Sequence, residues 1–132
     1  MNDSPRRILV VDDDPGVREA VRELLSGEGY AVVTAEDGQD ALERLRTMEA
    51  PCLILLDLRM PRVDGWEFLA RRDGVGKRAP VVLLSGMTFI PDAPGVADFL
   101  AKPIRPDKLL DCVRRFCGDR RPEEAAETPD SR

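Results

Sequence analysis

Apolar residues along the chain gather in five short runs, and the stretches between most of them carry apolar positions every three or four residues. A short apolar run without polar alternation is typical of a strand buried on both faces, whereas the three- to four-residue spacing is typical of an amphipathic helix. We therefore predict strands at residues 7–11, 30–35, 53–56, 81–84 and 98–101. Helices are predicted to begin near Pro15, Gly38, Gly65 and Pro106.

Strands that alternate with helices indicate βαβ units, so we predict an α/β fold with a doubly wound, five-stranded parallel sheet. The stretch from residue 86 to 97 must hold the last crossover before the fifth strand, and it contains Pro91, Pro94 and Gly95. A proline inside a helix costs about 3 kcal/mol. The fourth helix is therefore expected to be shortened or irregular.

The length of 132 residues suits one domain with a single core. We expect this domain to occupy residues 7–118, after an N-terminal extension at 1–6. Residues 119–132 are rich in Pro, Glu, Asp and Arg and lack apolar periodicity, which predicts a disordered tail.

Composition excludes several classes of function. The net charge of −5 argues against broad nucleic-acid binding, and the absence of histidine excludes a histidine metal site, a catalytic triad and a phosphohistidine carrier. No apolar run is long enough to span a membrane, and no signal peptide is evident. Cys52, Cys112 and Cys117 form an odd set without metal-ligand spacing, so we expect reduced thiols and a cytoplasmic protein.

Chemically capable side chains follow four of the predicted strands. Asp12 and Asp13 end the first, Asp57 the third, Ser85 the fourth and Lys102 the fifth. In a sheet of order 2-1-3-4-5 these four strands are neighbours, so their carboxyl ends would bring the side chains together.

Three carboxylates at one sheet edge repel one another unless a cation lies among them, and a hard ion such as Mg²⁺ fits oxygen ligands of this kind. Lys102 adds a positive charge and Ser85 a hydroxyl. This set of groups suits a phosphoryl group carried on a carboxylate, with Asp57 as the nucleophile. Each residue also has a plain structural interpretation: the aspartates as caps of helices or turns, and Lys102 as a solvated loop charge.

Four segments in order resemble the receiver domain of two-component response regulators. They are Ile8–Pro15 (ILVVDDDP), Leu55–Gly65 (LLDLRMPRVDG), Val82–Gly86 (VLLSG) and Asp98–Pro103 (DFLAKP). The resemblance covers residues 7–118, and it implies the flavodoxin-like strand order 2-1-3-4-5.

The resemblance also implies roles for individual residues. Asp57 would accept a phosphoryl group from the phosphohistidine of a sensor histidine kinase. Mg²⁺ would be held by Asp13 and Asp57 directly, by Asp12 through water and by the backbone carbonyl of Arg59.

Two further positions match the switch residues of that family. Ser85 stands where the family has its switch Ser or Thr, and Phe99 where it has its switch aromatic. From the sequence alone Phe99 could equally be an ordinary core residue.

We expect a stand-alone receiver that acts as a switch and not as a turnover enzyme, with no nucleic-acid or membrane partner. It would signal by protein–protein contacts, either with an effector or by relay to a histidine phosphotransfer protein. One alternative is a phosphorylation-independent interaction module, suggested by the shortened fourth-helix region. Another is a Mg²⁺-dependent phosphatase, which usually has a second acid two residues after the nucleophile, where this chain has Arg59.

Overall fold

The structure is a computed structural model that describes residues 6–58, 64–72, 79–86 and 95–118. Several predictions fall outside these residues. They are the backbone role of Arg59, the irregular fourth helix around residues 87–94, the tail at 119–132 and nearly all of the N-terminal extension.

Five parallel strands form a single sheet in the order β2-β1-β3-β4-β5, which confirms the predicted fold. The strands are β1 (Arg7–Val11), β2 (Ala31–Ala35), β3 (Leu53–Asp57), β4 (Val81–Ser85) and β5 (Val96–Ala101). β3 and β4 are buried along their whole length, as their uninterrupted apolar runs predict. β5 is one of the two edge strands of the sheet, and its residues alternate between half-buried and exposed.

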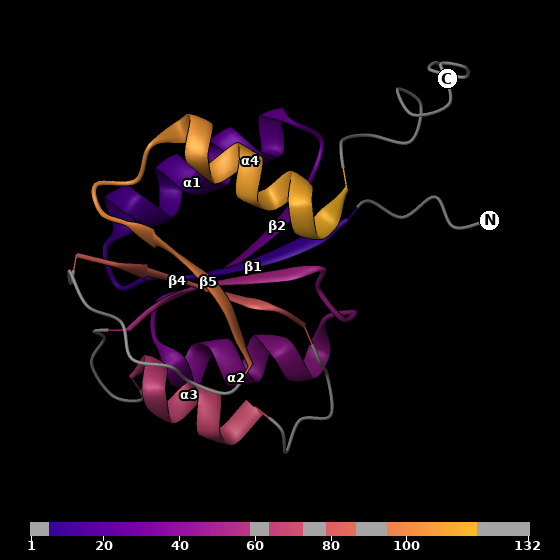
Figure 1. Cartoon of the computed structure of the whole chain (residues 1–132). Helices are drawn as coiled ribbons and strands as arrows, with labels where there is room; N and C mark the ends of the chain where they lie inside the picture. The colour runs from indigo at the N-terminus through magenta and orange to yellow at the C-terminus, as the bar shows by residue number, and fades with distance from the viewer. Residues whose placement is uncertain (1–5, 59–63, 73–78, 87–94, 119–132) are drawn as a thin grey trace.

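Helices cover both faces of the sheet. In the described part of the chain they are α1 (Pro15–Gly27), α2 (Gly38–Thr47), α3 (Gly65–Arg71) and α4 (Pro106–Cys117). Figure 1 shows α1 and α4 on one face, with α2 and α3 on the other. None of these helices is long and apolar enough to cross a membrane.

The core of the described residues is divided by the sheet into two clusters. Successive side chains of a strand point to opposite faces. Leu9 of β1 therefore packs with Phe68 of α3, whereas the adjacent Val10 packs with Val113 of α4. Core side chains thus pack against both faces of the sheet, and the carboxyl ends of the parallel strands lie at the same end of the sheet.

The expectation of three reduced thiols is wrong for two of them. Cys52 and Cys117 form a disulfide, with a Cα–Cα distance of 5.3 Å, and only Cys112 is a free, buried cysteine. The two bonded residues are 65 positions apart in the sequence. An odd cysteine count cannot show that the residue before β3 and the last residue of α4 lie side by side.

Candidate functional site

Three carboxylates meet at the carboxyl ends of β1 and β3. The register aligns Val11 of β1 with Leu56 of β3. The residues that follow them, Asp12 and Asp57, therefore lie beside each other. One carboxylate oxygen from each of Asp12, Asp13 and Asp57 lies within 4.8 Å of the others. Asp12 is fully buried and Asp57 is 6% exposed, whereas Asp13 is exposed. The predicted acidic cluster therefore forms.

Lys102 reaches this cluster from the end of β5. Its Nζ lies 2.9 Å from Oδ2 of Asp12 and 3.6 Å from Oδ2 of Asp57. Burial alone would lower the pKa of Lys102, but the carboxylates of Asp12 and Asp57 outweigh burial and raise it above its ordinary value. The lysine is therefore held as a cation at neutral pH.

Asp12 is fixed by the turn that follows it. Its Oδ1 accepts a hydrogen bond from the backbone N–H of Asp14 (2.9 Å), and Arg18 donates to its carbonyl oxygen (2.8 Å). Asp14 in turn caps α1, because its Oδ1 accepts from the N–H of Gly16 at 2.8 Å. Arg18 lies one helical turn beyond Asp14, and the sequence did not predict its contact with Asp12.

The second carboxylate oxygen of Asp12, Oδ2, is available to bind a further ligand. Oδ2 is buried and lies in the ion pair with Lys102, yet among the described residues it receives no well-directed hydrogen bond. A buried carboxylate oxygen is normally hydrogen-bonded or bound to a cation. This atom could therefore accept a further cation or an ordered water.

The segment after Asp57 depends on a glycine. The N–H of Gly65 donates to the carbonyl of Leu58 (3.1 Å), and Asp64 caps α3 by accepting from the N–H of Glu67 (2.9 Å). A Cβ on Gly65 would lie 2.7 Å from the carbonyl oxygen of Asp57. Only glycine permits this approach, so the turn at Asp64 and Gly65 holds α3 directly against the end of β3.

Ser85 lies beside the cluster, whereas Phe99 does not. Ser85 ends β4, is 3% exposed, and its carbonyl accepts from the backbone N–H of Lys102 at 2.8 Å. Phe99 lies on β5, aligned with Leu83 of β4, and its side chain is 41% exposed. The structure thus gathers Asp12, Asp13, Asp57, Lys102 and Ser85 at one edge, with Phe99 on the outer strand.

Comparison with known proteins identifies the family. Residues 8–114 match the model of the response regulator receiver domain. The chain belongs to this receiver family. It is 38% identical over 127 residues to the response regulator MprA of Mycobacterium tuberculosis, covering 92% of this chain and 55% of MprA. The receiver therefore spans about half the length of this curated relative.

Solved receivers share the fold. The chemotaxis protein CheY4 of Vibrio cholerae matches with a TM-score of 0.73 and 30% identity, over 86% of this chain and 99% of CheY4. The response regulator protein TrrA of Thermotoga maritima, solved in complex with Mg²⁺-BeF, matches with a TM-score of 0.74 and 32% identity. That match covers 84% of this receiver and 98% of TrrA.

The donor set of the receiver fits a hard divalent cation. Mg²⁺ takes oxygen ligands, keeps several waters and is usually held by one or two carboxylates. Asp13 and Asp57 offer carboxylate oxygens, and Asp12 offers the buried Oδ2 described above. The fourth predicted ligand, the backbone carbonyl of Arg59, lies outside the described residues.

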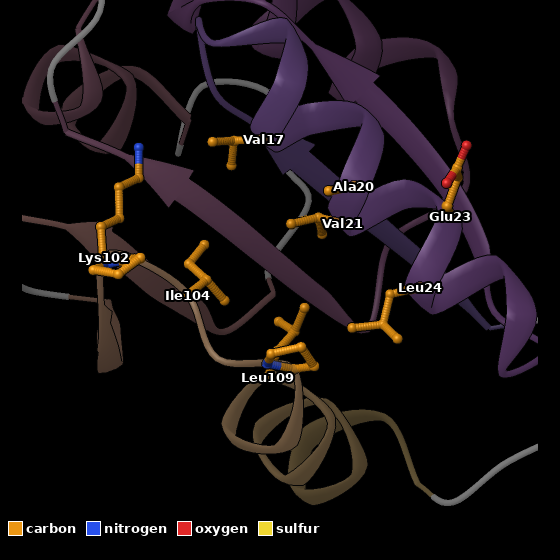
Figure 2. Close-up of a pocket in the computed structure, with 10 residues that line it drawn as sticks. Val17, Ala20, Val21, Glu23, Leu24, Lys102, Ile104 and Leu109 are labelled. Carbon is orange, nitrogen blue, oxygen red and sulfur yellow. The ribbon is translucent and has the colours of Figure 1, made fainter.

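An apolar groove adjoins the cluster on the face covered by α1 and α4. It has a volume of about 560 Å³, and Lys102 is one of its lining residues. Figure 2 shows side chains of α1 such as Val17 and Leu24 facing Ile104 and Leu109 across this groove. Sequence reasoning did not find it, because its two walls come from opposite ends of the chain.

Proposed function

We propose that this receiver is a phosphorylation-regulated switch. Asp57 accepts a phosphoryl group from the phosphohistidine of a sensor histidine kinase in a Mg²⁺-dependent phosphorelay. The observation that carries this proposal is the convergence of a nearly buried Asp57 with two further aspartates and Lys102 at the carboxyl edge of the sheet. The family match supports the same conclusion.

The reaction is a transfer of one phosphoryl group. A carboxylate oxygen of Asp57 attacks phosphorus, the N–P bond of phosphohistidine breaks, and the electron pair of that bond stays on the imidazole nitrogen. The product is an acyl phosphate on Asp57. The ammonium of Lys102, 3.6 Å from Oδ2 of Asp57, attracts the negative phosphoryl oxygens.

Bound Mg²⁺ would neutralise negative charge on the transferring phosphoryl group. Asp13 and Asp57 would hold it directly and Asp12 through water. The charge of these three carboxylates supports this assignment, as does the Mg²⁺-BeF complex of TrrA.

Ser85 and Phe99 would convert phosphorylation into a change of surface. We propose that the Ser85 hydroxyl binds a phosphoryl oxygen, since Ser85 is buried at the end of β4 beside Asp57. Phe99 exposes 41% of its surface, so turning it inward would bury apolar area and alter the surface of β5. A small change of charge would thus bias a two-state packing.

The receiver would signal through protein–protein contacts rather than by turnover of a substrate. The groove beside Lys102 offers apolar surface to a kinase or phosphotransfer protein that approaches Asp57. A separate effector would read the phosphorylated form, in the cytoplasm. Action without an output domain stays a prediction, because the chain spans 55% of MprA.

Phosphoramidate tests this function, because its N–P bond resembles that of phosphohistidine. The chain is incubated with phosphoramidate and Mg²⁺, and the modified peptide is identified by mass spectrometry. We expect one phosphoryl group on Asp57 and none in the variant Asp57→Asn. Unmodified wild-type protein that still binds a partner would overturn the proposal in favour of a phosphorylation-independent interaction module. Release of phosphate from small phosphomonoesters, lost in Asp57→Asn, would overturn it in favour of a phosphatase.

A further inference from the structure

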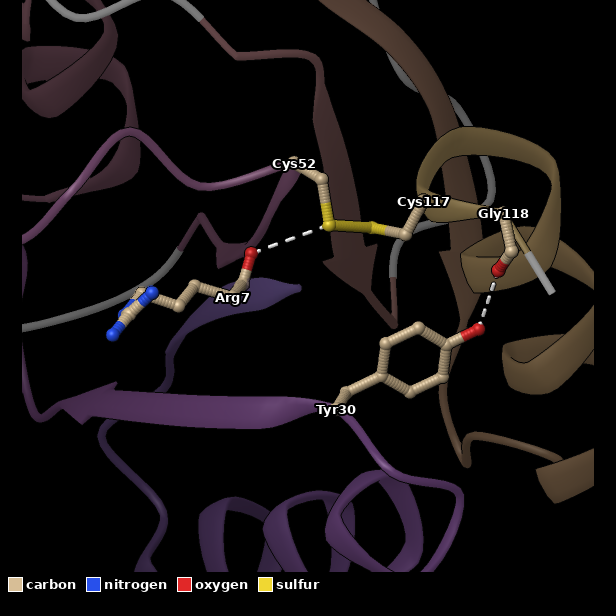
Figure 3. The surroundings of a disulfide bond; sticks show 5 residues. All are labelled: Arg7, Tyr30, Cys52, Cys117 and Gly118. Carbon is tan, nitrogen blue, oxygen red and sulfur yellow. Dashed lines mark hydrogen bonds between the residues drawn. A yellow bond between two sulfur atoms is a disulfide. The ribbon is translucent and has the colours of Figure 1, made fainter. Parts of the chain in front are cut away.

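A disulfide fastens the last residue of α4 to the sheet. It joins Cys52, directly before β3, to Cys117, with 5.3 Å between the Cα atoms (Figure 3). Cys52 lies at the amino end of β3 and Asp57 at its carboxyl end. At about 3.3 Å per residue, five residues separate the two by about 16 Å. The disulfide therefore lies at the amino ends of the strands, opposite the acidic cluster at their carboxyl ends.

The surroundings of Cys52 suit a thiol as well as a disulfide. The backbone N–H of Cys52 donates to the carbonyl of Arg7 at 2.8 Å, and the Sγ of Cys52 lies 3.3 Å from the same oxygen (Figure 3). A disulfide sulfur has no hydrogen to donate, whereas a thiol has one. Reduction would therefore give Cys52 a hydrogen bond to an acceptor already in place.

Exposure favours exchange at this pair over Cys112. Cys52 is partly exposed, whereas Cys117 is 1% exposed, so a small reagent reaches Cys52 first. Cys112 is buried, and burial raises the pKa of its thiol.

We propose that Cys52 and Cys117 form a reversible modification site that exchanges with low-molecular-weight disulfides. The thiolate of Cys52 attacks one sulfur of the small disulfide, which releases a thiol and leaves a mixed disulfide. The thiolate of Cys117 then attacks the Sγ of Cys52 and releases the second thiol. Two protein thiols lose two electrons, the small disulfide gains them, and the two protons pass to the released thiols.

The effect of this exchange is local to the end of α4. In the oxidised form the disulfide joins that end to the sheet, and the Tyr30 hydroxyl donates a hydrogen bond to the carbonyl of Gly118 (2.6 Å). Reduction removes the disulfide and leaves the hydrogen bond. The last turn of α4 then opens more often, while the proposed phosphorylation site at the carboxyl ends of the strands keeps its contacts.

A redox titration tests the proposal. The chain is equilibrated at a series of ratios of reduced to oxidised glutathione, quenched with acid, denatured and labelled with a maleimide. We expect the intact mass to show three labels under reducing and one under oxidising conditions, with peptide mapping assigning the bond to Cys52 and Cys117. The control Cys112→Ser should pass from two labels to none. The same label count at every ratio, or a bond that contains Cys112, would overturn the proposal.

Hydrogen exchange tests the local effect, and melting tests the contribution of the cross-link to global stability. Reduction should speed amide exchange in the last turn of α4 and lower the Tm by about 10 °C in wild type and in Cys112→Ser. The variant Cys52→Ser should not respond to reduction. Equal exchange of α4 in both redox states of wild type would contradict the proposed link. Neither experiment needs a phosphoryl donor, and both are repeated on Asp57→Asn. A negative result would therefore count against the redox proposal without bearing on the proposed phosphorylation of Asp57.

Discussion

Lys102 is paired more closely with Asp12 than with Asp57. Its Nζ lies 2.9 Å from Oδ2 of Asp12, so the ion pair joins the end of β5 to the end of β1 across the two strands between them. The distance to Oδ2 of Asp57 is 3.6 Å. In this structure the lysine therefore chiefly neutralises the fully buried carboxylate.

Removal of this cation should destabilise the fold. In Lys102→Met, the carboxylate of Asp12 stays buried without its partner. We expect the free energy of unfolding at pH 7 to fall by about 2 kcal/mol, less than the roughly 3–5 kcal/mol of a fully buried pair. The expected loss is smaller because the Lys102 side chain is 26% exposed. Urea denaturation measures the difference.

The matched control is Lys108→Met, which removes an exposed lysine of α4. We expect it to change the free energy of unfolding by less than about 0.5 kcal/mol. Equal stability of the two variants would show that the pair with Asp12 contributes nothing.

The stabilising effect of Lys102 should disappear at high pH. The carboxylates of Asp12 and Asp57 raise its pKa in the folded protein above that in the unfolded chain, despite burial. A raised pKa gives stability that is complete below the unfolded value, roughly 10.4, and is lost as the pH rises through the folded value. The stability difference between wild type and Lys102→Met should therefore be constant from about pH 7 to 9.5 and shrink above roughly pH 10.4. A difference that shrinks below pH 9 would contradict this assignment.

Gly65→Ala should disturb both stability and phosphorylation. The new Cβ would lie 2.7 Å from the carbonyl oxygen of Asp57 and 2.8 Å from the Cα of Leu58, so backbone must move. We expect a loss of about 2 kcal/mol and slower phosphorylation of Asp57. The control Gly27→Ala adds a methyl group where no atom beyond the neighbouring residues and the backbone of its own helix lies within 4 Å, and it should cost no stability. Phosphorylation of Gly65→Ala at the wild-type rate would show that the contact does not position Asp57.

Tyr30→Phe tests the hydrogen bond at the end of α4. The substitution deletes the hydroxyl that donates to the carbonyl of Gly118 at 2.6 Å. We expect a loss of about 1 kcal/mol in the free energy of unfolding, measured by denaturation of the reduced protein. Faster amide exchange should accompany it in the last turn of α4. Unchanged exchange there would mean that the hydrogen bond does not secure the helix end.

The sequence predicted the parts of this receiver that depend on local pattern. Uninterrupted apolar runs predicted β1, β3 and β4. The apolar run of β3 also predicted that Asp57 lies at the carboxyl end of that strand. β5 begins at Val96, two residues before the predicted Asp98, because an edge strand is half-buried and its pattern is weaker. The sheet order came from the family resemblance, since alternation alone does not fix it.

Features that depend on distances between remote residues were not predicted. The sequence placed Lys102 near the carboxylates but could not show that Asp12 is its closer partner. The disulfide between Cys52 and Cys117 was missed for the same reason. Both depend on how side chains that are remote in the sequence meet after folding.

The central claim is that Asp57 is the phosphoacceptor of a Mg²⁺-dependent switch. Its most direct test is the intact mass of the chain after incubation with acetyl phosphate, with Mg²⁺ and with a chelator. We expect wild type to gain the mass of one phosphoryl group with Mg²⁺ only, and Asp57→Ala to gain none. No gain in wild type, or an equal gain in Asp57→Ala, would contradict the account.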